Sequence, residues 1–337
     1  MKISASIYSN KDRTLENLIK DLDNYNVDML HVDFNDKKIE LNKIEKDIKQ
    51  IRNLCEKPID LHIISDTPNK YSKFIKDYKI EYVTYQLENI VEELNIYKSN
   101  HTKYGIAITS NTSINQFDKY KNFCDFILLM TTTPGESGGK FNNINFKKIR
   151  EFKSTYPSKK IHIDGGVNDE IAFILRIHGV KSVVSGSYLV NGDIAKSLLE
   201  LKSSVSSSKI KIKEFMQNRE EFPIVNGDCS VEDILIKIEE YDLGFVCVED
   251  VNMKFLGIIS MADIRKGMLK DFNQFQNLKA QNILNDDPIV IKETNSINNM
   301  LSTIQNKNFL ISFIPVLNNS KKLVGLVTFF NLIKSES

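Results

Sequence analysis

Short apolar runs alternate with amphipathic stretches over the first 202 residues, and this alternation constrains the fold more than any other feature of the chain. The runs have the length of strands, whereas the stretches between them show the apolar spacing of helices that bury one face. Eight strands alternating with about eight helices in roughly 200 residues predict an α/β fold, a parallel (β/α)8 TIM barrel. The strands are expected near residues 2–7, 28–33, 58–64, 80–85, 104–109, 125–130, 160–164 and 181–185.

The amphipathic stretches give the positions of the expected helices. The clearest of them lie at residues 15–24, 41–54, 90–97, 146–156, 170–178 and 194–201. A doubly wound parallel sheet is the alternative fold. It would need fewer strands and a glycine-rich turn after the first strand, and residues 6–9 do not supply that turn. The barrel is therefore the favoured prediction.

The chain is too long for one ordinary domain, and its pattern changes after a serine-rich stretch at residues 203–208. We assign residues 1–202 to the barrel, 203–221 to a linker, and 222–270 and 281–337 to two copies of a smaller α+β unit. The two copies are most similar in sequence at residues 255–263 of the first and residues 323–331 of the second. A repeat that occurs only twice predicts a packed pseudo-twofold pair and not a solenoid.

Composition excludes several classes of protein. The 45 Lys and Arg residues nearly balance the 44 Asp and Glu residues, so no broad basic surface for nucleic acid is expected. No apolar stretch approaches the roughly 18 residues of a membrane-spanning helix, and the N-terminus lacks the apolar core of a signal peptide. The four cysteines lack metal-type spacing, which indicates reduced thiols and a cytoplasmic protein.

Two imidazoles and two carboxylates lie at or near the ends of three apolar runs: His31, Asp33, His62 and Asp164. If these runs are strands of one barrel, their C-terminal ends converge at one mouth. Two nitrogen and two oxygen donors form a reasonable ligand set for a divalent metal. The carboxylates could also move protons. His162, two residues before Asp164, is expected to be structural and one layer deeper in the barrel.

Six short motifs follow one another along the first region. They read Ile-Ser-Ala-Ser-Ile at 3–7, His-Val-Asp-Phe-Asn-Asp at 31–36, Asp-Leu-His-Ile-Ile at 60–64, Met-Thr-Thr-Thr-Pro-Gly-Glu-Ser-Gly-Gly-Lys-Phe at 130–141, Ile-Asp-Gly-Gly-Val at 163–167 and Ser-Gly-Ser at 185–187. In this order they resemble the motifs of the ribulose-phosphate 3-epimerase family. The resemblance implies an isomerase on the same barrel fold.

The resemblance also implies a ligand set and a reaction. His31, Asp33, His62 and Asp164 would bind one divalent ion per barrel: Zn, Fe, Mn or Co. One catalytic aspartate, Asp33 or Asp164, would remove the proton at C3 of a ketose phosphate. The metal would stabilise the enediolate, and the other aspartate would return a proton to the opposite face. This logic fits the chemistry, because inversion needs a base on each face with a pKa suited to proton exchange near neutrality.

Further substrate-binding residues follow from the same motifs. They are Ser6, Met130 and Gly138, with Gly165, Gly166, Gly186 and Ser187 in two turns after the seventh and eighth strands. Bare backbone N–H groups in such turns form an anion site for the substrate phosphate. The implied substrate is ribulose 5-phosphate, xylulose 5-phosphate or a related pentulose or hexulose phosphate.

Four positions depart from the family pattern. Asn35 and Ile64 stand where the family has methionines, Glu136 replaces a lid phenylalanine, and Gly139 replaces a glutamine. These changes remove no ligand and no base, so they bear on the identity of the sugar. They also leave open a catalytically disabled barrel that acts as a nucleotide-responsive binding protein. A lyase or decarboxylase of the same superfamily is disfavoured, because its Asp-x-Lys-x-x-Asp motif is absent.

The C-terminal region resembles a tandem of CBS domains. The resemblance is carried by residues 244–249 with 257–263, and by residues 313–317 with 325–331. It implies an adenosine nucleotide held by Ser260, Asp263 and Thr328, since a carboxylate accepts hydrogen bonds from both hydroxyls of a ribose. In the second copy Asn331 replaces the acid. The pair is expected to be regulatory or dimerising, and the protein to be a homo-oligomer. The alternative is a pair that only packs or dimerises, with Asp263 as an ordinary helix cap.

Overall fold

The computed structural model describes the chain except for residues 97–98, 204–207, 271, 306, 308–310 and 335–337. The chain forms two compact units. The first begins at Met1 and holds the barrel, and the second spans Ser208–Ile333.

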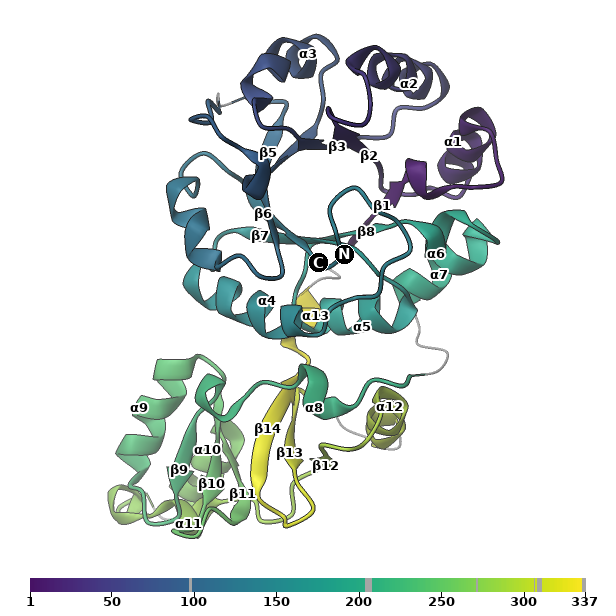
Figure 1. Cartoon of the computed structure of the whole chain (residues 1–337). Coiled ribbons are helices and arrows are strands. Elements are labelled where there is room, and N and C mark those ends of the chain that lie inside the picture. Colours follow the sequence, from purple (N-terminus) through teal and green to yellow (C-terminus); the bar gives the residue numbers. More distant parts are fainter. Residues whose placement is uncertain (97–98, 204–207, 271, 306, 308–310, 335–337) are drawn as a thin grey trace. The chain divides into compact units, whose positions relative to one another are not determined.

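The first unit is a closed barrel of eight parallel strands in the order β1 to β8, with β1 paired to β8 (Figure 1). The strands are β1 (Lys2–Ser6), β2 (Met29–Asn35), β3 (Ile59–Ile64), β4 (Tyr82–Gln86), β5 (Lys103–Thr109), β6 (Phe126–Met130), β7 (Lys160–Asp164) and β8 (Ser182–Ser185). Closure confirms the predicted (β/α)8 barrel and excludes the doubly wound sheet.

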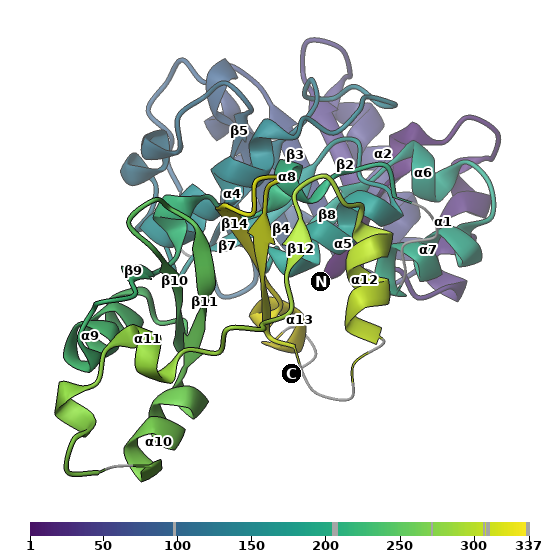
Figure 2. The same ribbon diagram turned by 90° about the horizontal axis from the view of Figure 1, so that it is seen from below.

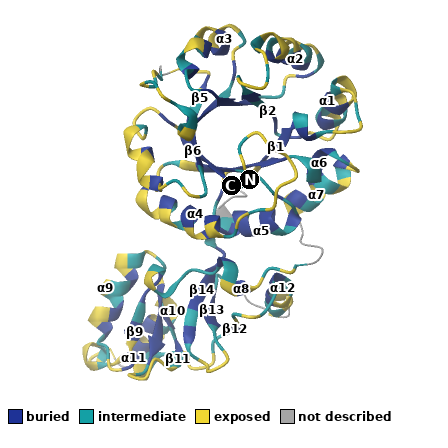
Figure 3. Ribbon diagram, in the orientation of Figure 1, coloured by how far each residue is buried: buried dark blue, intermediate teal, exposed yellow. Residues whose placement is uncertain are grey.

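Helices surround the strands (Figure 1). They are α1 (Leu15–Asn24), α2 (Leu41–Leu54), α3 (Ser72–Asp77), α4 (Ile144–Thr155), α5 (Asp169–Ile177), α6 (Ser187–Val190) and α7 (Ile194–Ser203), with 3-10 turns η1 (Ile7–Ser9), η2 (Pro68–Tyr71), η3 (Leu87–Asn89) and η4 (Ile114–Lys119). The strands are buried and the helices expose their outer faces (Figure 3), as the amphipathic pattern predicts. No helix in the described part of the chain is long and apolar enough to cross a membrane.

The helix expected at residues 90–97 is wrong over its described part, residues 90–96. This segment is bonded to residues 66 and 69, ahead of it in the chain, instead of to itself. The Asn69 backbone donates to Glu92 Oε1 (2.8 Å), its amide donates to the Glu93 carbonyl (2.8 Å), and its oxygen accepts from the Asn95 N–H (2.9 Å). Tertiary hydrogen bonds therefore override a weak local helical pattern. Tyr97 lies outside the described residues.

The second unit contains two copies of a small α+β unit. The first has β9 (Ile224–Asn226), α9 (Val231–Tyr241), β10 (Phe245–Glu249), β11 (Phe255–Ser260) and α10 (Met261–Lys270); the second has β12 (Ile291–Lys292), α12 (Ile297–Gln305), β13 (Phe313–Leu317), β14 (Leu323–Thr328) and α13 (Phe330–Lys334). The short helices α8 (Ile212–Phe215) and α11 (Ala280–Ile283) precede them, with 3-10 turns η5 (Arg219–Glu221) and η6 (Phe275–Asn277). Each copy forms a three-stranded sheet, and α9 and α12 lie on opposite outer sides of the pair (Figure 2).

The two copies exchange the segments that precede them. Gln217, ahead of the first copy, pairs with Leu326 on β14 through two backbone hydrogen bonds of 2.8 and 3.1 Å. Asn285, ahead of the second copy, pairs in the same way with Ile258 on β11 at 2.8 and 3.0 Å. Gly257 permits this approach, since a Cβ there would lie 2.1 Å from the Asn285 carbonyl oxygen. Part of the segment expected as a linker therefore pairs within the second unit.

An aromatic core joins the two sheets. The rings of Phe245 on β10 and Phe313 on β13 stack with centroids 3.5 Å apart. Phe222 and Leu326 are buried in the same cluster. Arg219 adds a bidentate ion pair to Glu249 of the first copy and donates to the Leu323 carbonyl of the second at 2.7 Å. Each copy alone would expose this apolar face, so the pair is the folding unit.

Candidate functional site

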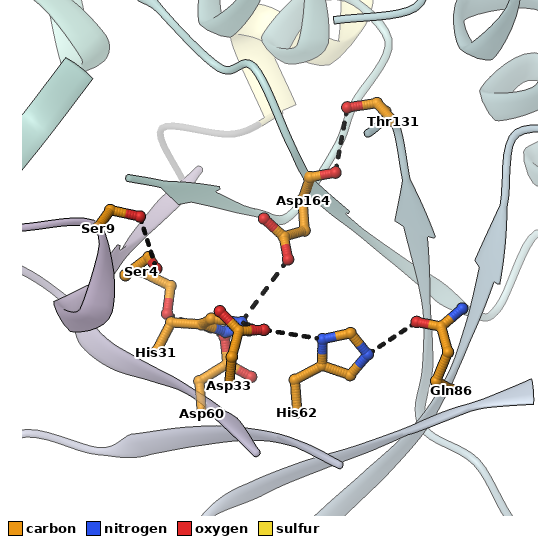
Figure 4. Close-up of polar contacts among 10 residues, drawn as sticks. Ser4, Ser9, His31, Asp33, Asp60, His62, Gln86, Thr131 and Asp164 are labelled. Atoms are coloured by element: carbon orange, nitrogen blue, oxygen red, sulfur yellow. Dashed lines mark hydrogen bonds and ion pairs between the residues drawn. The ribbon is translucent and has the colours of Figure 1, made fainter. Parts of the chain in front are cut away.

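The carboxyl ends of three strands bring together the four residues singled out in the sequence. β2 supplies His31 and Asp33, β3 supplies His62, and β7 ends on Asp164. One donor atom from each residue lies within 4.8 Å of all the others (Figure 4). Both imidazoles are fully buried, whereas the Asp33 and Asp164 side chains are 20% and 15% exposed toward the mouth. The cluster is therefore open on its carboxylate side.

The distances within the cluster suit a shared cation. His31 Nε2 lies 3.3 Å from Asp33 Oδ1 and 3.6 Å from Asp164 Oδ2. His62 Nδ1 lies 3.2 Å from the same Asp33 oxygen. Two nitrogens and two carboxylate oxygens in one buried pocket fit a divalent ion such as Zn, Fe, Mn or Co. The donor set does not distinguish among these metals.

A second layer of polar side chains orients both imidazoles. Asp60 Oδ2 lies 3.0 Å from His31 Nδ1 and also accepts from Ser4 Oγ at 2.9 Å. Gln86 Oε1 lies 2.8 Å from His62 Nε2. Each ring thus has one nitrogen engaged and presents the other to the cluster, as ligating histidines commonly do. The sequence contained one signal for this layer: Asp60 lies two residues before His62 and so points the same way.

The environment moves the pKa values of the two carboxyls in opposite directions. Burial penalises the charge on Asp33, but the adjacent His31 and His62 imidazoles outweigh that penalty and lower its pKa. Burial, reinforced by the nearby Asp33 charge, raises the pKa of Asp164 to about 6. Burial also opposes the charge on His31, yet Asp33 and Asp60 hold the pKa of this imidazole well above its usual value. Asp33 is therefore ionised at neutral pH, and Asp164 is the carboxyl whose pKa lies nearer to neutrality.

The turns after β7 and β8 depend on glycine. Gly165 and Gly166 have φ values of +114° and +62°, where side chains are strained. A Cβ at Gly166 would lie 2.2 Å from the backbone nitrogen of Phe141 in the loop after β6. A Cβ at Gly186 would lie 2.4 Å from Ser9 Oγ, in the turn that follows β1. The turns after β7 and β8 therefore pack closely against the loops that follow β6 and β1, which leaves no room for a side chain at Gly166 or Gly186.

The other predicted barrel residues are found in different settings. Ser6 ends β1, is 7% exposed and accepts from Ser9 Oγ at 3.1 Å. Met130 ends β6 and packs in the barrel against Ala107 and Leu128. Gly138 is exposed with a φ of +85°, and Ser187 begins α6.

His162 lies deeper in the barrel and stacks on the ring of Phe126, with centroids 4.1 Å apart. Burial lowers its pKa to about 4. A neutral ring stacked in an apolar layer is what a structural role requires.

The candidate nucleotide residues of the second unit are engaged locally. Asp263 Oδ2 accepts from the Ser260 N–H at 3.0 Å and from the Ser260 hydroxyl at 2.6 Å, at the start of α10. Asp263 is thus a helix cap in this structure. Thr328 ends β14 and is 8% exposed.

Fold and site together define the class: a (β/α)8 barrel with a four-residue cluster suited to a divalent metal at its mouth, followed by a paired α+β repeat. Comparison with known families then identifies both parts. The Ribulose-phosphate 3 epimerase family matches residues 2–190, and the CBS domain matches residues 212–270 and 280–337. The chain belongs to the ribulose-phosphate 3-epimerase family and carries a tandem of CBS domains.

Individual relatives agree with the family match. The chain is 26% identical over 217 residues to ribulose-phosphate 3-epimerase of Bacillus subtilis (strain 168), covering 60% of this chain and 99% of that protein. It is 30% identical over 170 residues to the enzyme of Aquifex aeolicus (strain VF5), covering 48% and 76%. It is 28% identical over 234 residues to that of Methanocaldococcus jannaschii, covering 65% and 99%.

Solved structures with similarity to the chain include CBS proteins. A CBS domain-containing protein from Bacillus anthracis str. Ames Ancestor is 23% identical, with a TM-score of 0.34, covering 38% of this chain and 92% of that one. CBSX2 from Arabidopsis thaliana is 20% identical, with a TM-score of 0.32, covering 37% and 93%.

Proposed function

We propose that this protein catalyses the metal-dependent 3-epimerisation of a ketose phosphate. Ribulose 5-phosphate and xylulose 5-phosphate are the first candidates, because the relatives above are named for that reaction. The observation that carries the proposal is the pair of carboxyls, Asp33 and Asp164, which share one cluster and have pKa values displaced in opposite directions. Such a pair supplies a base and an acid in the same pocket.

The two aspartates divide the proton transfer between them. Asp33, ionised, accepts the proton from C3, and Asp164 delivers a proton to the opposite face of that carbon; in the reverse reaction the roles exchange. A divalent ion held by His31, His62 and the two carboxylates would stabilise the negative charge that develops on the substrate oxygens. Asp60 and Gln86 keep the two imidazoles oriented while the carboxylates act.

The remaining barrel residues are proposed to hold the substrate. Gly165, Gly166, Gly186 and Ser187 offer backbone N–H groups to its phosphate, and their packing against neighbouring loops keeps those turns rigid. In the same proposal Ser6, Met130 and Gly138 contact the sugar or close over it. Met130 is the register partner of Asp164 on the neighbouring strand, which supports a position beside the reacting carbon.

Deuterium exchange tests the activity directly. The metal-loaded protein is incubated with a panel of ketose phosphates in D2O, and loss of the C3–H signal is followed by NMR. At least one substrate should exchange and invert at C3. Exchange with none of them, in protein shown to hold stoichiometric metal, would refute the proposal.

A second candidate is the disabled barrel that serves as a nucleotide-responsive binding protein. This candidate is supported by the four residues that depart from the family pattern: Asn35, Ile64, Glu136 and Gly139. Glu136 is exposed, and Ile64 is buried with its Cδ1 near the position of a Gly135 Cβ. Metal analysis of the purified protein separates the two candidates, since a disabled barrel needs no stoichiometric metal.

For the second unit we propose regulation or dimerisation through the CBS pair, with an adenosine nucleotide bound near Ser260, Asp263 and Thr328. The proposed division keeps the barrel at residues 1–202 and a linker that begins at residue 203; the CBS match itself starts at residue 212. Calorimetry with AMP, ADP, ATP and S-adenosylmethionine tests the nucleotide. Binding of none of them would leave a role in assembly, which sedimentation of the full chain would measure.

A further inference from the structure

A chain of hydrogen bonds runs outward from one candidate metal ligand. His62 Nε2 lies 2.8 Å from Gln86 Oε1, and Gln86 Nε2 donates to Glu88 Oε2 at 2.5 Å. Figure 4 shows the His62 ring between the Asp33 carboxylate and the Gln86 amide, whose oxygen faces the ring. Gln86 ends β4 and is 1% exposed, whereas Glu88 is at the surface.

Glu88 dictates which end of the Gln86 amide faces the imidazole. A carboxylate only accepts hydrogen bonds. Glu88 Oε1 already accepts from the Thr109 N–H at 2.8 Å and from the Thr112 hydroxyl, so the carboxylate is held in place on the far side. A reversed amide would put the Gln86 carbonyl oxygen against the carboxylate oxygen. The amide nitrogen therefore points to Glu88, and the amide oxygen points to His62.

The amide orientation in turn decides the tautomer of His62. Facing a carbonyl oxygen, Nε2 carries the hydrogen, and Nδ1 is left with its lone pair directed toward Asp33 and the cluster. We propose that Gln86, locked by Glu88, is a positioning residue that sets the tautomer of His62 and so makes Nδ1 a metal ligand. This inference rests on the proposed metal-dependent function. It assigns a role in that function to two residues of β4 and its following turn that touch no other member of the cluster.

The same strand offers a matched control. Thr84 lies two residues before Gln86, is fully buried, and is opposite His62 in the strand register. Within the described part of the chain its hydroxyl has no hydrogen-bond partner. Thr84→Val therefore perturbs the same buried face of β4 without touching the proposed relay.

The test compares Zn²⁺ affinity and the His62 tautomer in four full-length variants. Gln86→Leu keeps the volume and removes the acceptor, so we expect a loss of Zn²⁺ affinity of about 10- to 100-fold. In the metal-free protein, 15N NMR of the histidines should show the hydrogen of His62 on Nε2 in the wild type. In Gln86→Leu, where Nε2–H has no acceptor, the hydrogen should move toward Nδ1, which faces Asp33. Thr84→Val should change neither measurement.

A double variant that exchanges the side chains of positions 86 and 88 should restore Zn²⁺ binding. In Gln86→Glu/Glu88→Gln the carboxylate at position 86 accepts from His62 Nε2–H and from the amide at position 88. The oxygen of that amide still faces Thr109. Both the Zn²⁺ affinity and the His62 tautomer should therefore return to those of the wild type. Glu88→Gln alone should lower affinity by a smaller factor, although Glu88 touches neither imidazole. This surface variant also serves if Gln86→Leu fails to fold.

The wild type and the variants together distinguish failure of the proposed function from failure of the inference about Gln86. If the wild type does not bind Zn²⁺, the proposed metal-dependent function itself fails. If the wild type binds but Gln86→Leu and Glu88→Gln bind equally well with unchanged 15N shifts, the relay is overturned and the proposed function stands.

Discussion

The barrel and the CBS pair complete the hydrogen bonding of their strand edges in different ways. The barrel closes on itself through β1 and β8, so no strand edge is left open. The CBS pair has two small open sheets, whose edge strands β11 and β14 each accept a segment from the other copy. The candidate functional residues of the two units also differ in where their partners lie. Asp33 and Asp164 are held among side chains from several strands, whereas Asp263 bonds to Ser260 in its own turn.

This difference indicates where function and stability overlap. In the barrel, the groups proposed for catalysis belong to one buried network, so a change to one of them alters its neighbours. In the CBS pair, the exchanged segments hold the two copies together, whereas Ser260 and Asp263 form a local cap. Substitutions should therefore separate function from stability in the second unit more cleanly than in the first.

The largest effect is expected from Asp164→Asn. It keeps the shape of the side chain and removes one acid–base group, so inversion at C3 should fall by about 10²- to 10⁴-fold. Formation of the C3 epimer is measured by NMR with saturating metal. Exchange of C3–H through Asp33 can persist, and unfolding of the CBS pair should be unchanged. A variant that inverts C3 as fast as the wild type would show that Asp164 takes no part in proton transfer.

Breaking the exchanged pairing should have the next largest effect. An alanine Cβ at Gly257 would meet the Asn285 carbonyl oxygen at 2.1 Å, and the residue has a φ of +155°. We expect Gly257→Ala to lower the free energy of unfolding of the second unit by about 1–3 kcal/mol. Denaturant unfolding of the full chain measures this.

Gly227→Ala is the matched control for that variant, because the nearest atom to its Cβ would belong to the Leu256 side chain, at 3.3 Å. Epimerisation by the barrel should survive in both variants. Equal stability of Gly257→Ala and Gly227→Ala would contradict the structural importance of the exchange.

A smaller effect is expected on the pH dependence of metal binding, and it concerns only the barrel. Burial raises the pKa of Asp164 to about 6, and a metal binds the ionised carboxylate more tightly than the protonated carboxyl. Above pH 6 this group is mostly ionised; below pH 6 the metal must displace its proton. Zn²⁺ affinity should therefore fall by about tenfold per pH unit below 6 on account of this group. Competition with a chelator at pH 6.5, 5.5 and 4.5, in the wild type and in Asp164→Asn, measures it, and the same pH dependence in both proteins would contradict the assignment.

The smallest effect is expected at the cap of α10. Asp263→Ala removes the acceptor for Ser260 and should cost the second unit about 1 kcal/mol, whereas Asp263→Asn keeps an acceptor oxygen and should cost less. If Asp263 also binds ribose, the alanine variant should lose the nucleotide-induced shift in unfolding temperature. An alanine variant with the wild-type shift would restrict Asp263 to its capping role.

Much of the architecture could be read from local pattern. All eight barrel strands lie within two residues of their predicted positions, and α1 and α2 match their predicted bounds. Apolar runs of strand length and amphipathic stretches carry this information locally. The helix expected at residues 90–97 failed because Asn69, more than 20 residues earlier in the chain, supplies the hydrogen bonds that the segment would otherwise make with itself.

The candidate site divides in the same way. The sequence by itself identified His31, Asp33, His62 and Asp164, since their residue types and their places at strand ends are local facts. Only the tertiary structure paired Asp60 with His31 and placed Gln86 between His62 and Glu88. The bond from Gln86 to Glu88 is local, but the other two bonds, from Asp60 to His31 and from Gln86 to His62, join neighbouring strands. The physical reason is that the strand register, which brings these side chains together, is decided only when the whole barrel closes and packs.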